Sequence, residues 1–142
     1  MRWRIPELAF VALSLLPAGA SAATVTHAWF RALPAGLPSA GYFTLANSGT
    51  KPISLTDAQS PVCSMLMLHK STGGEGMSMM SDVTGVDVPA GGQIKFAPGG
   101  YHLMCMDPTP LMKPGAKVNV TLIFADKSRM DVLFNVKNAK GQ

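Results

Sequence analysis

Apolar and polar residues alternate in short stretches through most of the chain after residue 22. The pattern is clearest near the end, where every second residue from Val118 to Phe124 is apolar, and so is every second residue from Met130 to Val136. Because side chains two apart share one face of a strand, this alternation predicts β-strands with one buried face. Nine segments fit the pattern: 24–32, 41–46, 53–58, 65–70, 77–83, 93–96, 101–106, 118–124 and 130–136.

Glycine, proline, asparagine and aspartate separate these segments, as expected of turns between strands. Residues 71–76 form a glycine-rich loop between two of them, which indicates a hairpin. No helical periodicity of useful length follows residue 22. The sequence therefore predicts an all-β fold, a Greek-key sandwich or barrel of about eight or nine short strands.

The first 22 residues have the pattern of a secretory signal. Arg2 and Arg4 precede the apolar run 8–16, and residues 17–22 end in the small residues that signal peptidases recognise. The run is shorter than the roughly 20 residues that a membrane-spanning helix needs. We expect cleavage after Ala22, which leaves residues 23–142 as one domain in the periplasm; an uncleaved anchor is the alternative.

Charge and motifs exclude several classes of function. Without residues 1–22 the chain carries ten basic and seven acidic residues, a net charge of +3, and the basic residues are scattered singly. This argues against nucleic acid as a partner. The chain has no phosphate-binding glycine loop, nucleophile elbow or zinc-protease motif, and it has only two glutamates. We therefore do not expect an enzyme.

Methionine and histidine carry the chemical signal. Ten of the 142 residues are methionine, and two of the three histidines stand close to methionines. Met65, Met67 and His69 share the parity of one strand face, and so do the residues of a second set: His102, Met104 and Met106. Further methionines lie at 77–80, beyond the hairpin loop.

Thioether sulfur and imidazole together favour copper, and monovalent copper in particular. Thioethers stay available as ligands in an oxidising compartment, where thiols tend to form disulfides. The alternative is that these methionines fill the core, as alternating methionines often do. Periodicity alone leaves both interpretations open.

The spacing of four of these residues matches a known motif. His69, Met80, His102 and Met104 are separated by ten, twenty-one and one residues. The chain thereby resembles the periplasmic copper(I) chaperone family PCuAC, whose motif is His-x10-Met-x21-His-x-Met. The resemblance extends to the surroundings: residues 28–31, 40–49, 60–61, 88–92, 98–104, 111–115 and 121–124.

The resemblance implies a cupredoxin-like β-domain that binds Cu(I) through His69, Met80, His102 and Met104. It also implies delivery of the ion to a copper-receiving protein, either a cytochrome c oxidase subunit or another assembly chaperone. We expect a monomer that meets a membrane only through that partner.

Two departures from the family pattern matter. Family members often have methionine two residues after the first histidine, where this chain has Ser71. Some carry a tail rich in histidine and methionine that adds a second copper site, whereas residues 138–142 contain neither residue. The expectation is therefore one copper site.

Cys63 and Cys105 form an even pair, which favours a disulfide in a secreted protein. Cys63 shares strand parity with His69, whereas Cys105 is opposite in parity to His102, so two regular neighbouring strands would point the cysteines to opposite faces. Pro61 suggests that Cys63 still lies in a loop, which would remove the conflict. Two free thiols, or Cys105 as a copper ligand, are the alternatives.

Two other functions are compatible with the sequence. A blue-copper electron carrier needs two histidines, a cysteine thiolate and a weak methionine ligand, and His69, His102, Cys105 and a methionine could supply them. Such carriers usually place the cysteine before the last histidine, unlike this chain. A secreted β-domain without metal is the second alternative.

Overall fold

The computed structural model describes residues 22–74 and 77–142, with side chains for 22–72 and 80–142. The regular structure of these residues consists of strands, with one 3-10 turn at Pro34–Gly36. The strands are β1 (Ala23–Arg31), β2 (Ser39–Asn47), β3 (Ile53–Gln59), β4 (Met65–Gly74), β5 (Met77–Asp82), β6 (Val86–Val88), β7 (Gln93–Phe96), β8 (Tyr101–Met106), β9 (Lys117–Phe124) and β10 (Arg129–Lys137).

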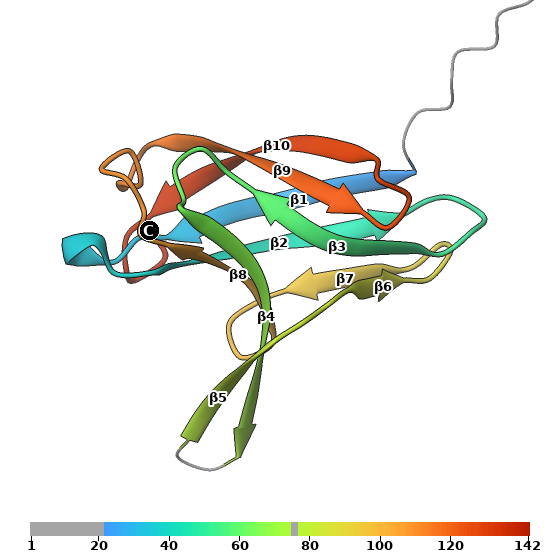
Figure 1. Ribbon diagram of the computed structural model, residues 1–142, viewed down its shortest axis with the longest axis horizontal. Coiled ribbons are helices and arrows are strands. Elements are labelled where there is room, and N and C mark those ends of the chain that lie inside the picture. The colour runs from blue at the N-terminus through green and yellow to red at the C-terminus, as the bar shows by residue number, and fades with distance from the viewer. Residues whose placement is uncertain (1–21, 75–76) are drawn as a thin grey trace, which may run out of the picture.

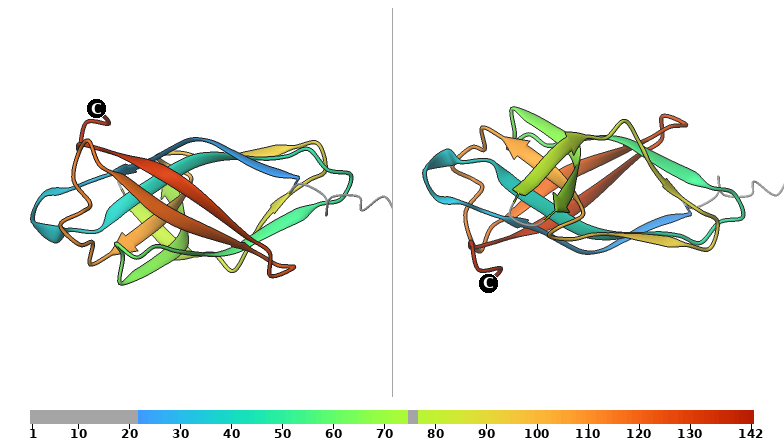
Figure 2. Two further views of the ribbon diagram at one scale, coloured as in Figure 1. Left: turned by 90° about the horizontal axis from the view of Figure 1, so that it is seen from above. Right: turned by 90° about the horizontal axis from the view of Figure 1, so that it is seen from below.

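The strands belong to one curled sheet with the order β5-β4-β8-β2-β1-β10-β9-β3-β6, and β7 also pairs with β2. The first part of β2 pairs with β8 and the later part with β7. The first and last strands, β1 and β10, lie parallel and side by side (Figure 1). Seen from above and from below, strands from different parts of the sheet cross over one another, as expected of a sheet that curls around its own interior (Figure 2). The prediction of an all-β, cupredoxin-like fold is confirmed.

The strand count differs from the prediction by one short element. Within the described ranges there are ten strands, and the missed one is β6, which pairs with β3. It has three residues between Gly85 and Pro89, too few for a period of two to be recognised. Tertiary pairing with β3, rather than local pattern, makes it a strand.

The core lies inside the curled sheet and centres on four phenylalanines. Phe30, Phe43, Phe96 and Phe134 are each at most 2% exposed and come from β1, β2, β7 and β10. The ring centroids of Phe43 and Phe96 are 4.3 Å apart, and those of Phe30 and Phe134 are 5.1 Å apart. These contacts join strands from both ends of the chain, so folding of the core fixes the frame that holds β4 and β8.

The alternation seen in the last two strands corresponds to burial. On β9, the four alternating residues Val118, Val120, Leu122 and Phe124 are at most 5% exposed. On β10, Phe134 and Val136 are buried, while Met130 and Val132 pack against the core from partly exposed positions. The predicted inward faces are therefore correct.

The expected leader lies outside the described residues except for Ala22, so the leader, its cleavage and the boundary of the domain stay predictions. In the part of the chain that the structure covers, no helix is long and apolar enough to cross a bilayer.

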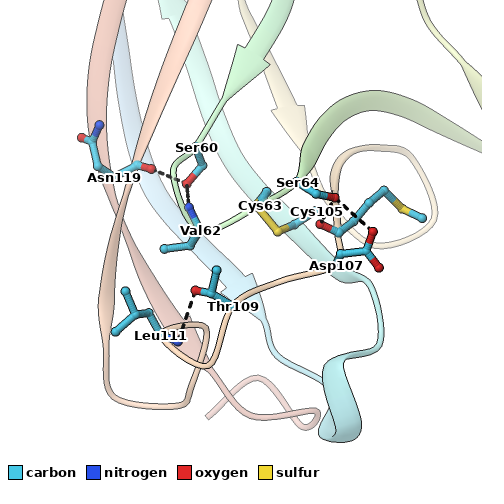
Figure 3. The surroundings of a disulfide bond; sticks show 10 residues. Ser60, Val62, Cys63, Ser64, Cys105, Asp107, Thr109, Leu111 and Asn119 are labelled. Carbon is cyan, nitrogen blue, oxygen red and sulfur yellow. Dashed lines mark hydrogen bonds between the residues drawn. A yellow bond between two sulfur atoms is a disulfide. The ribbon is translucent and has the colours of Figure 1, made fainter.

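Cys63 and Cys105 form a disulfide with their Cα atoms 5.3 Å apart (Figure 3). Cys63 precedes β4, which begins at Met65, so it does not follow the strand's alternation. Cys105 is fully buried and shares a face of β8 with Leu103. The loop position of Cys63 resolves the parity conflict, and the bridge ties the start of β4 to β8.

Replacing both cysteines with serine is expected to lower the free energy of unfolding by about 3–4 kcal/mol. The reason is that a bridge between residues 42 apart restricts the unfolded chain. Urea denaturation of the metal-free protein measures the change, with reduced wild type as the matched control. A loss below about 1 kcal/mol in both samples would contradict a stabilising bridge.

Candidate metal site

The two segments that carry histidine and methionine pair directly with each other. β4 and β8 are antiparallel, and each pair of directly opposite residues is called a rung below. Directly opposite residues in such a pair project to the same face. The rungs on one face are Met65–Met106, Met67–Met104 and His69–His102.

The opposite face of the same two strands faces the core. Leu66, Leu68, Leu103 and Cys105 alternate with the histidines and methionines and are at most 5% exposed. The two faces therefore have different roles: one is apolar and packs inside the domain, and the other gathers imidazole and thioether groups. The alternation within each strand predicted which histidines and methionines share a face, and the pairing of β4 with β8 brings the two sets together.

Met80 joins the same face from β5, the third strand. In the β4–β5 pair, Asp82 lies opposite His69 and Met80 lies opposite Ser71. Met80 is therefore in phase with His69, whereas Met79 pairs with Thr72, one position out of phase. Met80 is 57% exposed, on a hairpin that projects from the body of the domain (Figure 1). The strand register thus gives a physical reason to prefer Met80 over Met79.

The four predicted ligands thus lie on one face of the three adjacent strands β5, β4 and β8. The His69–His102 rung is in the middle, Met104 lies two residues farther along β8 toward the disulfide, and Met80 lies two residues from Asp82 toward the hairpin tip. His27, the third histidine, lies away from this face. It is exposed at a bulge in β1, and two strands, β2 and β8, separate β1 from β4.

The two ring nitrogens of His102 differ in their hydrogen bonding: one contacts a backbone carbonyl and the other has no hydrogen-bond partner among the described residues. His102 is only 4% exposed, and its Nδ1 is 3.3 Å from the carbonyl oxygen of Gly100. Its Nε2 is buried without a hydrogen-bond partner among the described residues. A protein carbonyl on one ring nitrogen commonly orients a histidine whose other nitrogen binds a metal.

His69 has a similar arrangement. Its Nε2 is 2.8 Å from Oδ1 of Asp82, a close contact that is not a hydrogen bond. Its Nδ1 is buried, again with no hydrogen-bond partner within the described ranges. The two imidazole rings meet edge to face with centroids 5.6 Å apart. Buried polar atoms without partners are costly unless something binds them, so both rings fit a bound ion.

Burial lowers the pKa of His102. The hydrogen bond to the Gly100 carbonyl raises this pKa and the neighbouring His69 lowers it, both by less than burial does. A lowered pKa keeps the imidazole neutral, and only the neutral ring has a lone pair to give to a metal. The environment of His102 therefore favours its ligand form.

Asp82 and Gly100 are site residues that sequence reasoning missed. Asp82 reaches His69 only because the β4–β5 hairpin has this register, and Gly100 acts through a backbone carbonyl. Neither role leaves a signal in the residue types alone.

The disulfide also bears on the electron-carrier alternative. A blue-copper site needs a cysteine thiolate as ligand. Cys105 is bonded to Cys63, and the described residues contain no free cysteine. The arrangement that paired Cys105 with His69 and His102 around copper is therefore incompatible with this structure, and so is Cys105 as a free thiol.

Comparison with known proteins agrees with this architecture. The family model described as "Putative lipoprotein LpqE-like" matches residues 23–136. The relative described as "Putative lipoprotein Lxx21020", from Leifsonia xyli subsp. xyli, is 33% identical over 118 residues, which cover 82% of this chain and 70% of the relative.

Two solved structures extend the comparison. The CuI-DR1885 structure from Deinococcus radiodurans is 30% identical with a TM-score of 0.64, covering 89% of this chain and 83% of that chain. The copper-bound PCuAC domain from PmoF2 has a TM-score of 0.69 over 84% of this chain and 96% of that domain. At 20% identity, the second likeness concerns the fold alone. From the family match and these relatives, the chain belongs to the LpqE-like family, which is the PCuAC family.

Proposed function

We propose that this protein is a periplasmic copper chaperone that binds one Cu(I) through His69, Met80, His102 and Met104. The observation that carries the proposal is the pairing of His69 with His102, where a buried and a partly buried imidazole meet, each with a buried ring nitrogen that has no hydrogen-bond partner in the described chain. Thioethers in phase on either side complete a set of four neutral, soft or borderline donors. Cu(I) is the ion that this set suits best.

The known relative supports the choice of ion. The solved form of DR1885 with Cu(I) is 30% identical to this chain over 89% of its length. The donors of this chain also argue against a hard cation, since no carboxylate belongs to the four. Asp82 contacts His69, and we assign it the orientation of that ring rather than a bond to the metal.

The uneven burial of the ligands suits transfer rather than permanent storage. His102 is 4% exposed, whereas Met80 is 57% exposed on the projecting hairpin (Figure 1). A receiving protein can approach on the Met80 side and replace this thioether first, while the histidines still hold the ion. No catalytic step is needed for this exchange, so the proposed role is not that of an enzyme.

We place the transfer in the periplasm and the receiver in the assembly of cytochrome c oxidase copper centres. The signal-like pattern of residues 1–22 and the relatives named as lipoproteins support export. The resemblance to the copper(I) chaperone family supports the oxidase as receiver.

The ligand set is tested by Cu(I) affinity in competition with a chromogenic Cu(I) chelator. Met80→Leu, Met104→Leu and His102→Ala are each expected to weaken binding at least about tenfold, equivalent to 1.4 kcal/mol, because each removes one donor. Met80→Leu is the most informative variant, since Met80 is exposed and its loss does not disturb the core.

Met79→Leu is the matched control, because Met79 is adjacent but out of phase, and its affinity is expected to stay within about twofold of wild type. Circular dichroism checks the fold of each variant. Unchanged affinity in all three ligand variants would overturn the site.

Delivery is tested by mixing Cu(I)-loaded protein with the metal-free soluble domain of the oxidase subunit that holds the dinuclear copper centre. After separation, we expect most of the copper on the oxidase domain, because thiolates there bind Cu(I) more strongly than neutral thioethers. The control is the same domain with its cysteines alkylated. Equal copper on the intact and alkylated domains would contradict delivery.

A further inference from the structure

The row of soft side chains on β4 and β8 continues beyond the four proposed ligands. Past the rung that holds Met104, the next rung on the same face is Met65–Met106, and Met67 lies opposite Met104 itself. Three thioethers, those of Met65, Met67 and Met106, thus occupy the same face without a role in the proposed copper site. They are called the thioether row below.

Core filling does not account for this row. The core-facing residues of these strands are Leu66, Leu68, Leu103 and Cys105, and the thioether row lies on the opposite face. Met65 is 57% exposed, and Met67 and Met106 are partly exposed. A methionine used as core filler has a different environment: Met112 is only 8% exposed. The exposure of Met65 and the partial exposure of its two neighbours leave these side chains accessible to an ion from solvent.

The thioether row has a rigid support at its outer end. The backbone N–H and the hydroxyl of Ser64 both donate to the carbonyl oxygen of Met106, at 3.0 and 3.1 Å. The neighbouring Cys63–Cys105 disulfide fixes the same end of the two strands (Figure 3). The hydroxyl of Ser64 also lies 3.1 Å from Oδ2 of Asp107, so an exposed carboxylate stands beside Met106. These contacts hold the register and add a negative charge near the row.

We infer that Met65, Met67 and Met106 form a second, weaker subsite for Cu(I). Opposite residues in an antiparallel pair have Cβ atoms about 4.5–5.5 Å apart, so thioethers from one rung can both reach an ion between them. Three thioethers without imidazole give a soft, neutral donor set that suits Cu(I) but binds it less tightly than a set with two histidines. Because Met67 faces Met104, the subsite adjoins the proposed four-ligand site, and an ion can pass from one to the other.

The inference goes beyond the proposed function, which concerns one ion at the four-residue site. We expected a single copper site because residues 138–142 contain neither histidine nor methionine. The pairing of β4 with β8 supplies a different source of ligands, which the sequence does not reveal because it depends on which residues stand opposite each other.

The experiment is a Cu(I) titration of the full mature protein labelled with 13C at the methionine methyl groups, followed by NMR under reducing, anaerobic conditions. The inference predicts that the methyl signals of Met65 and Met106 shift mainly between one and two equivalents of Cu(I). Met112 and Met130, which lie in or against the core, are internal controls and should not move. If the Met65 and Met106 signals stay in place up to two equivalents, the inference is overturned.

A double variant gives an independent readout. Met65→Leu with Met106→Leu is expected to weaken the second step at least about tenfold and to leave the first within about twofold, with Met130→Leu as the matched control. A second step unchanged by the double variant would overturn the assignment. Met80 and Met104 report on the four-ligand site separately, so failure of the proposed function would be seen at those methyl groups and not confused with failure of the subsite.

Discussion

The antiparallel pairing of β4 with β8 is the constraint on which the site depends. It puts His69 opposite His102 and Met67 opposite Met104, and on the other face it sends leucines and Cys105 into the core. A slip of one residue would exchange these faces, turning the leucines away from the core and the imidazoles toward it. The hydrophobic effect that folds the domain therefore also enforces the geometry of the metal-binding face.

Two further contacts reinforce this register. The disulfide joins Cys105 to the loop just before β4, and Ser64 donates twice to the carbonyl of Met106. At the other end, the β4–β5 hairpin extends the same face outward and adds Met80 and Asp82 (Figure 1). One end of the strand pair is thus fixed and the other projects into solvent. A chaperone needs this combination, because a preformed pair of histidines limits the cost of ordering ligands and an exposed thioether leaves room for a receiver.

Much of the fold was predictable because it follows from local pattern. Alternation placed β9 and β10 and their buried faces, and the chain has turn residues wherever strands end. β6 escaped prediction because its three residues become a strand only through pairing with β3. The two halves of the soft face were also predictable from parity within each strand. The alignment of these two halves was not predictable, because it depends on how β4 pairs with β8. The contact of Asp82 with His69 and the face on which Met80 lies depend in the same way on the pairing of β4 with β5. The disulfide was predictable as a pair, and Pro61 also indicated the loop position of Cys63, before β4, that lets the bridge form.

X-ray absorption spectroscopy at one equivalent of Cu(I) decides whether two imidazoles and two thioethers bind one ion on this face. We expect a first coordination shell with both nitrogen and sulfur, fitted by two imidazole nitrogens and two thioether sulfurs. Met80→Leu should remove one sulfur from that shell and leave both nitrogens. A shell without sulfur, or one without imidazole nitrogen, would rule out this ligand set.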